Sequence, residues 1–203
     1  ELEPKSHETS PPARYTEASL VKKLETEGIG RPSTYATIID TIVRRGYVHI
    51  VSHTLVPSFT AFATTNLMEN HFGDLVDTGF TAKMEEVLDD IARGEKGWLP
   101  YIKKFYSGKN GLGEKTVNKT EEIKPGEYRE ITFDDVKAKI CIGRYGPYIE
   151  SGEGEEKITA SIPQDITPAD LDQDAVESIL LRQLKSTEEL GTHPETDDPI
   201  FLL

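Results

Sequence analysis

The stretch "GIGRPSTYATIIDTIVRRGYV", residues 28–48, places glycines and hydroxyls before one apolar pattern and two arginines after it. Ser33 or Thr34 is suitable as the N-cap of a helix, and Gly46 as its end. Between them the apolar residues recur at the three- and four-residue spacing of a helix with one buried face. These residues are Tyr35, Ile38, Ile39 and Ile42. The stretch therefore predicts a short amphipathic helix with polar groups at both ends.

The segments on either side of this helix follow different patterns. Upstream, Thr16 is placed to cap a helix over residues 17–27, which Gly28 would end. Downstream, "YVHIV" and "TLVP" are typical of two short strands, with Ser52-His53 as the turn. Helix, helix and hairpin in this order are typical of a winged helix-turn-helix, in which the second helix reads DNA and the hairpin is the wing.

Further along, the first half of the chain remains helical in pattern. We expect three more helices, over residues 58–71, 82–92 and 98–106. The stretch from 108 to 127 is poor in apolar residues and rich in Gly, Lys and Glu, which predicts a linker. We therefore expect a mainly helical unit over 1–107, a linker over 108–127, and a second unit over 128–203.

The second unit reads as a β-rich repeat followed by a helix. Residues 128–152 alternate in the manner of strands with glycine-rich turns. Thr167 is placed to cap the helix of "TPADLDQDAVESILLRQL", with Pro168 at its first position. The final stretch, 190–203, resembles the beginning of another repeat, so we expect a truncated second repeat and a cut C-terminus; Glu1 likewise is not a natural start. The fold class expected for the whole chain is α+β.

The chain is strongly acidic, and its charged residues are unevenly distributed. The chain has 36 acidic and 23 basic residues, a net charge of −13, which argues against a protein that coats nucleic acid without regard to sequence. Residues 1–107 hold 12 bases and 15 acids, whereas residues 108–203 hold 11 and 21. Phosphate contacts are therefore expected in the first half, and a protein partner is the expectation for the acidic second half.

Several classes of protein and site are excluded or disfavoured. No apolar run approaches the length of a membrane span. The single Cys141 excludes an internal disulfide and a cysteine-based zinc ribbon, which fits a reducing cytoplasm. His49 and His53 lie on a hairpin without a third metal ligand, and are expected at the surface. The acids of "DLDQD", residues 170–174, are expected in the first turn of a helix rather than in a calcium loop.

The helix of residues 33–46 offers two sets of groups for an anion. At its N-terminus, where backbone N–H groups are unpaired, Arg31, Ser33 and Thr34 can hold a phosphate, and Tyr35 can stack on a base. Arg44 and Arg45 lie about 15 Å away at the other end, so a polynucleotide, but no small ligand, reaches both. Ordinary capping and compensation of the helix dipole explain the same residues equally well.

Two aromatic clusters are further candidates. In "GRYGPY", residues 143–148, Arg144, Tyr145 and Tyr148 combine a cation with two rings on a tight turn, which suits single-stranded DNA. Acidic residues that follow closely would repel phosphates: Glu150, Glu153, Glu155 and Glu156. The second cluster is expected to form an apolar helix face, with base stacking as the alternative: Trp98, Tyr101, Phe105 and Tyr106.

Three stretches resemble bacterial type IA DNA topoisomerases. "PPARYTEASLVKKLETEGIGRPSTYATIIDTIVRRGYV", residues 11–48, resembles the segment that follows their catalytic domain. "GFTAKMEEVLDDIARGEKGWLPYIKKFY", residues 79–106, resembles the helices that close the same core. "GRYGPYIESG" and the "ASIP" after it look like the C-terminal repeat of these enzymes.

The resemblance implies an enzyme that relaxes negatively supercoiled DNA without ATP. In the family a tyrosine cleaves one strand transiently, the other strand passes, and a TOPRIM domain holds Mg²⁺. Arg31, Thr34 and Arg45 match family positions that contact the single strand, and Ser33 and Tyr35 match neighbouring motif positions. Arg14 lies in the matched "PPAR". The family also implies a bacterial, cytoplasmic and nucleoid-associated protein.

The residues that cut DNA in the family have no match here. Its nucleophile lies in a Tyr-Met-Arg-Thr-Asp context that none of the eight tyrosines of this chain has. No Asp-x-Asp pair follows an apolar strand as a TOPRIM pair would. The resemblance therefore implies a C-terminal fragment that holds single-stranded DNA, has no activity alone, and leaves the Mg²⁺ ligands outside this chain. A winged-helix regulator and an acidic protein-interaction module remain the alternatives.

Overall fold

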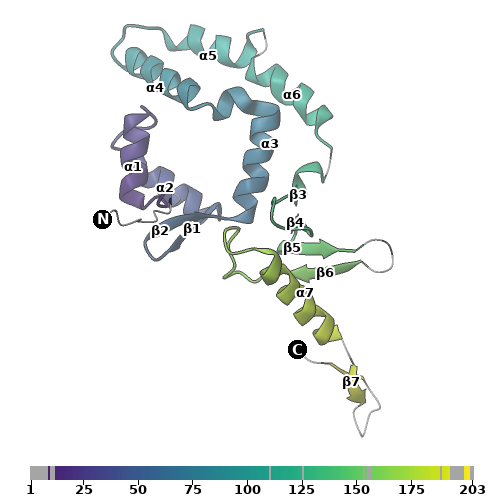
Figure 1. The fold of residues 1–203 in the computed structure, drawn as a ribbon. Coiled ribbons are helices and arrows are strands. Elements are labelled where there is room, and N and C mark those ends of the chain that lie inside the picture. The colour runs from purple at the N-terminus through teal and green to yellow at the C-terminus, as the bar shows by residue number, and fades with distance from the viewer. Residues whose placement is uncertain are drawn as a thin grey trace, which may run out of the picture.

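A computed structural model describes residues 9, 12–109, 111–124, 126–152, 154, 157–187, 189–192 and 199–201. It is an α+β protein with three small antiparallel sheets in that part of the chain (Figure 1). The first elements are helices α1 (Glu17–Thr26) and α2 (Tyr35–Arg44), followed by the hairpin of strands β1 (Val48–Val51) and β2 (Thr54–Pro57). The order helix, helix, hairpin is thus confirmed.

Local sequence signals account for the ends of these elements. The Thr16 hydroxyl accepts a hydrogen bond from the Ser19 N–H and caps α1. Gly28 and Gly46 follow α1 and α2 with φ angles of 70° and 69°, a backbone conformation that glycine adopts without strain. Residues 52 and 53 both have positive φ and form the hairpin turn, as expected.

Four helices follow the hairpin: α3 (Phe59–Val76), α4 (Thr78–Ala92), α5 (Trp98–Ser107) and α6 (Leu112–Glu122). The first three confirm the expected helices. Helix α6 lies within residues 108–127 and was not expected from the sequence, whereas the linker assigned to these residues stays a prediction. Its residues include good helix formers, and the helix packs beside α5, a tertiary contact that a composition-based argument does not detect. The division into units stays a prediction.

The C-terminal sheet has four strands in the order β3 (Glu130–Ile131), β4 (Lys139–Gly143), β5 (Gly146–Ser151), β6 (Ile158–Ser161), after the 3₁₀ turn η1 (Glu127–Arg129). Ile140 pairs with Ile149, and Ile149 with Ala160, on the buried face of the sheet. Helix α7 (Gln173–Thr187) packs beside β6. Strands β7 (Glu189–Thr192) and β8 (Pro199–Phe201) pair beyond it; the assignment of this hairpin to a second repeat stays a prediction.

The start of α7 corrects the expected cap. The Thr167 hydroxyl donates to the Asp170 carboxylate in a turn before the helix, and Pro168 is not helical. The Asp172 carboxylate accepts from the Ala175 N–H instead and caps α7. Asp170 is therefore a turn residue, and only Asp174 of the acids expected in the first helical turn lies there.

The beginning of α3 is built into the core of the C-terminal sheet. Phe59 is 4% exposed and belongs to the same buried cluster as Ile140 and Ile149. Its ring meets Phe133 edge-on, with ring centroids 6.1 Å apart. Further along α3, a hydrogen bond joins His71 Nε2 and the Tyr128 hydroxyl. One helix therefore contacts the C-terminal part at two points, the core of the sheet through Phe59 and the turn η1 before the sheet through His71.

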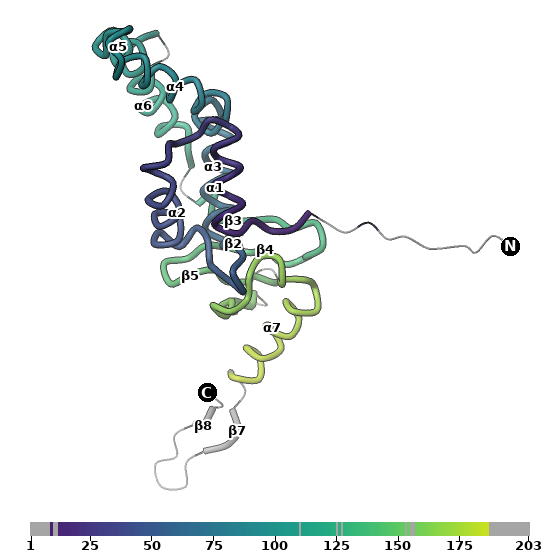
Figure 2. Tube along the Cα trace, turned by 90° about the vertical axis from the view of Figure 1, so that its left-hand side faces the viewer, coloured from purple at the N-terminus to yellow at the C-terminus, as the bar shows by residue number. Residues whose placement is uncertain are grey.

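The elements lie in a simple arrangement around α3. In Figure 1, α1 and α2 face α3, the β1–β2 hairpin joins them at one end, and α4 joins them at the other. Helices α5 and α6 lie at the far end from α7, which leads away from the sheet in both Figure 1 and Figure 2. No helix in the described part of the chain is long and apolar enough to span a membrane.

Because Phe59 completes a core made mostly of later residues, its truncation should loosen the later sheet. We expect Phe59→Ala to lower the free energy of unfolding by about 3–5 kcal/mol, and to accelerate amide hydrogen exchange in β4 and β5. Phe62→Ala is the matched control, because Phe62 also meets the Phe133 ring but is 38% exposed. Faster exchange confined to α1 and α2 in Phe59→Ala would contradict a shared core.

Candidate nucleic-acid interface

The N-terminus of α2 lacks a side-chain cap. Thr34 occupies the N-cap position, one of the two residues expected there. Its hydroxyl, however, accepts a hydrogen bond from the Arg31 N–H at 2.9 Å and donates one to the Arg31 carbonyl at 3.0 Å. The carbonyl of Arg31 also accepts from the Tyr35 N–H. No described residue accepts a hydrogen bond from the N–H groups of Ala36 and Thr37, and both residues are exposed. Two backbone donors at the positive end of the helix dipole therefore remain for an anion.

Arg31 forms an ion-pair network with α4. Its Nη2 donates to Asp89 Oδ2 at 2.7 Å, and its Nη1 lies 3.8 Å from Glu85 Oε2. Nη1 also donates to the Gly30 carbonyl at 2.6 Å, and Glu85 accepts from the Gly30 N–H. The turn between α1 and α2 is thereby fastened to α4. We call Arg31, Glu85 and Asp89 the clasp.

The clasp does not use the whole guanidinium. Nη1 donates to two carbonyls and Nη2 to one carboxylate, so the Nε–H and one Nη2–H have no partner among the described residues. The hydrogen bond with Asp89 raises the pKa of Arg31, so the group stays charged. The Arg31 side chain is 35% exposed. It can therefore position the turn and still present donors to a phosphate.

Ser33 and Tyr35 occupy different environments. Ser33 is exposed and makes no hydrogen bond to a described residue. Tyr35 is half-buried in a groove of about 550 Å³ between α1 and α2, where Val21 and Ile39 also line the wall. Its ring also lies close to Gly30, so closely that a Cβ there would come within 3.2 Å of it. Tyr35 is thus part of the packing of α2 and also lines the groove.

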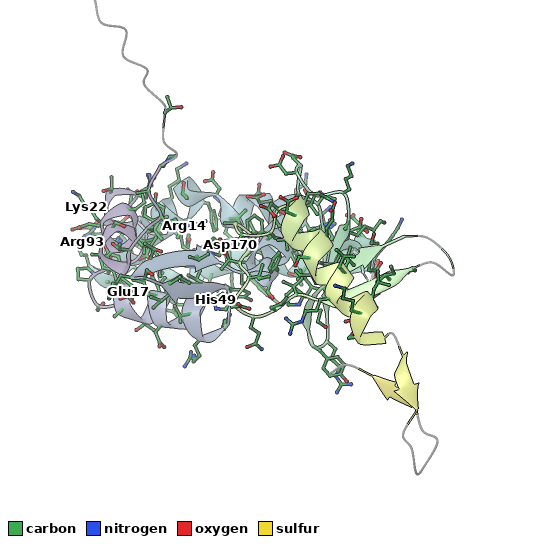
Figure 3. The ribbon with its side chains drawn as sticks, turned by 60° about the horizontal axis from the view of Figure 1, so that its bottom comes forward. Arg14, Glu17, Lys22, His49, Arg93 and Asp170 are labelled. Carbon is green, nitrogen blue, oxygen red and sulfur yellow. The ribbon has the colours of Figure 1, made fainter. Side chains whose placement is uncertain are left out.

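The other end of α2 is exposed. Arg44 is the last helical residue and Arg45 the C-cap, and neither forms an ion pair with a described residue. The hairpin that follows carries His49, Ile50 and Val51 exposed at its surface; Figure 3 labels His49 there. The hairpin has no Lys or Arg. Free cations near this end of α2 therefore belong to the helix and not to the hairpin.

The turn between β4 and β5 presents the second predicted group. Tyr145 is 96% exposed, and the Arg144 guanidinium lies over its ring, 5.8 Å from the centroid. The turn borders a shallow concavity of about 410 Å³, which Tyr148 and Ser161 also line. An aromatic ring with a cation above it and open space beside it is a platform for stacking.

Tyr148 lies inside the sheet, unlike Tyr145. It pairs with Cys141 across β4 and β5, and its ring covers Gly143, where a Cβ would come within 3.0 Å of the ring. Burial raises the pKa of Tyr148, and the nearby Cys141 and Glu150 add to this. The hydrogen bond from Lys157 lowers the pKa of Glu150, and this ion pair neutralises one acid of the predicted repelling group. Glu153, Glu155 and Glu156 lie outside the described residues.

The predicted residues form two separate groups. Arg31, Ser33, Thr34 and Tyr35 gather at one end of α2, and Arg45 lies about 16 Å along it. The β4–β5 group, Arg144, Tyr145 and Tyr148, belongs to the C-terminal sheet and not to α2 or its neighbouring turn. Glu85 and Asp89 were missed. Their spacing of four on one predicted helix face was the available signal, but only the fold brings them to Arg31.

Comparisons with known proteins find similarity to DNA topoisomerases along most of the chain. A family model described as "DNA topoisomerase" matches residues 1–103, and one described as "Topoisomerase C-terminal repeat" matches residues 132–188. A solved structure of full-length topoisomerase I from Thermotoga maritima matches with a TM-score of 0.55 and 30% identity, over 78% of this chain and 26% of that one.

The curated relatives are named DNA topoisomerase 1. The protein of Synechococcus elongatus is 56% identical over 203 residues, all of this chain and 23% of that protein. The protein of Streptomyces coelicolor is 44% identical over 96% of this chain and 22% of its own length. The chain thus spans less than a quarter of these relatives. Because a family model covers half of the chain and the second covers most of the rest, the chain belongs to the DNA topoisomerase family.

Proposed function

We propose that this chain is the part of a bacterial type IA DNA topoisomerase that holds single-stranded DNA beside the cleavage site. The whole enzyme would relax negatively supercoiled DNA by transient cleavage of one strand and passage of the other. The observation that carries the proposal concerns the two ends of α2. Among the described residues, the Ala36 and Thr37 N–H groups beside Arg31 and Thr34 have no acceptor, and Arg45 at the other end has no ion-pair partner. The family relationship supports it.

The geometry suits a strand lying along α2. A phosphate at the N-terminus would accept from the Ala36 and Thr37 N–H groups and from the free donors of Arg31. Arg45 would meet a phosphate further along, since about 16 Å separates the helix ends. Exposed Ser33 is close enough in sequence to add a hydroxyl, and Tyr35 offers a ring edge to a sugar or base. The Arg144–Tyr145 turn and Tyr148 would bind another single-stranded segment.

A duplex-reading regulator is the less favoured function. A winged-helix regulator usually grips the DNA backbone with cations on its wing, and the β1–β2 hairpin has none. Beside the hairpin, the exposed cations without an ion-pair partner among the described residues include Arg44 and Arg45 at the end of α2. Tighter binding to a short duplex than to a single strand of the same length would favour the regulator.

We assign no metal chemistry to this chain. A type IA enzyme would use Mg²⁺, but the described side chains include no group of three His, Cys, Asp or Glu that is arranged to hold a metal ion. We place the Mg²⁺ ligands and the nucleophilic tyrosine in the part of the enzyme that this chain does not cover. The acidic residues 128–203 are proposed to meet a protein partner, and the whole enzyme to work on the bacterial nucleoid in the cytoplasm.

Arg45 provides a direct test of the strand-binding helix. We expect Arg45→Ala to weaken binding of a labelled single strand at every sequence, and to reduce the slope of log affinity against log salt by about 0.7, the share of one phosphate contact. Arg44→Ala is the matched control, because it removes the same charge from the neighbouring exposed position. Equal effects of the two substitutions would show general electrostatics and would reject a specific role for Arg45.

The role of the clasp can be tested by whether a substitution at Asp89 raises or lowers the affinity for DNA. Asp89→Asn removes a negative charge, which by electrostatics alone should strengthen DNA binding. If Asp89 holds Arg31 in position, the substitution should weaken single-strand binding about two- to fivefold, in line with a partly exposed ion pair. Glu86→Gln, an exposed neighbour on α4 outside the clasp, should leave affinity unchanged or slightly increased. Tighter binding by Asp89→Asn would mean that Asp89 withholds Arg31 from DNA.

A further inference from the structure

Helices α5 and α6 carry a basic segment in an acidic chain. Residues 96–119 contain six lysines and one acid, Glu114, a net charge of +5, while the chain as a whole has −13. In Figure 1, α5 lies at the end of the molecule opposite α7, and α6 leads from it back toward β3. Helix α5 is therefore separate from the β4–β5 turn. Such a local reversal of charge is the electrostatic mark of a polyanion site.

Half of these lysines are free to bind. Lys103, Lys104 and Lys109 are exposed and form no ion pair with any residue that the structure describes. The other three have partners: Lys96 with Asp90, Lys115 with Asp74, and Lys119 with Glu122. The free lysines follow one another along α5 and the turn after it, where the chain has no acid before Glu114.

Aromatic rings accompany the free lysines. Trp98 is 62% exposed and Tyr106 is 58% exposed, both on α5. They are eight positions apart in the sequence, so they lie about 12 Å apart along the helix. Ile102 lies between them and is also exposed. An apolar helix face was expected here, and it is present, but its largest rings are open to solvent.

A cavity also lies beside α5. It has a volume of about 790 Å³, within the usual range for ligand pockets. Tyr101 and Phe105 of α5 line it, and Phe105 stacks on Phe80 with ring centroids 6.2 Å apart. Lys104 also borders the cavity. An aromatic pocket edged by an unpaired cation is suited to a nucleobase whose phosphate stays outside.

We propose that α5 and the turn to α6 form a second binding surface for single-stranded nucleic acid. Bases stack on Trp98 and Tyr106, and the phosphates between them meet Lys103, Lys104 and Lys109. The surface is sequence-tolerant, because every base offers a π face and lysine recognises only the phosphate charge. The proposal goes beyond the α2 groove and uses none of its residues.

A polyanion fits this surface better than a protein does. Lysine is depleted in protein–protein interfaces, whereas here three exposed lysines without ion pairs to described residues share α5 and the residues after it with the exposed rings. A second copy of this acidic chain could use its acids, but the stacking rings would then need an apolar partner face. Aromatic rings alternating with lysines match the composition of single-strand binding grooves.

The surface contains its own reporter, because Trp98 is the single tryptophan of the chain. We expect a short oligothymidylate to quench the fluorescence of Trp98 in the 203-residue chain, and the quench to disappear with rising salt. Arg45→Ala should weaken binding at α2 but keep the quench. Failure of the α2 proposal therefore leaves this test intact.

Variants test the two parts of the surface separately. Trp98→Ala should weaken binding of a labelled oligothymidylate about fivefold or more, whereas Trp98→Phe, which keeps a stacking ring, should keep most of the affinity. In a chain with Trp98 intact, Lys103→Gln with Lys104→Gln should reduce the salt slope of the quench by about 1.4. Lys22→Gln with Lys83→Gln is the matched control, because both lysines are exposed on other helices (Lys22 in Figure 3).

Three outcomes would overturn the proposal. The first is an unchanged Trp98 emission at saturating oligothymidylate and low salt. The second is an equal effect of the two lysine pairs on the salt slope. The third is a blue shift of Trp98 emission with rising protein concentration, with a dimer in sedimentation and no quench by DNA; that result assigns the exposed face to a second copy of the chain.

Discussion

The packing of Phe59 into the C-terminal core is the contact on which the arrangement of this chain depends. The four-stranded sheet is small and cannot bury its apolar face by itself. Phe59 of α3 supplies part of the cover over that face. The bond between His71 and Tyr128 adds a second attachment, about 18 Å further along α3. Rotation about either contact would break the other. The C-terminal sheet is therefore held in a fixed orientation on α3 rather than hanging from a linker.

The clasp of Arg31, Glu85 and Asp89 holds another part of the molecule in place, because it attaches the turn between α1 and α2 to α4. Helices α1 and α4 bury no residue fully, so few apolar contacts hold the turn after α1. Hydrogen bonds from Arg31 to Asp89 and to its own loop, together with the bond from Gly30 to Glu85, hold the turn instead. Such a polar attachment is individually weak, since partly exposed ion pairs contribute little. Its main effect is on geometry, because it orients the unpaired N–H donors at the start of α2.

The sequence allows prediction wherever a structural feature depends on neighbours in the chain. Thr16, Gly28, Gly46 and the Ser52-His53 turn act through bonds to residues at most a few positions away, and each was located correctly. The prediction that Thr167 caps α7 was wrong because Asp172, five residues later, caps the helix instead. Contacts between distant residues were not predictable: 58 positions separate Arg31 from Asp89, and Phe59 packs in a core whose other buried residues begin at Ile131. For the site, the motif located α2 and its arginines, but gave no sign that Arg31 also fastens the fold.

A rigid frame with separate cationic surfaces has a consequence for how DNA is held. If α2, the β4–β5 turn and α5 each contact a single strand, α3 and the clasp fix the distances between those contacts. A short oligonucleotide then meets each surface independently, with the modest affinity of a few phosphates and one or two stacked bases. A strand long enough to reach two surfaces gains from effective concentration, and its affinity rises by far more than the second contact alone would give. In an acidic chain, which repels phosphates from most of its surface, that requirement for simultaneous contact favours long exposed single strands over short ones.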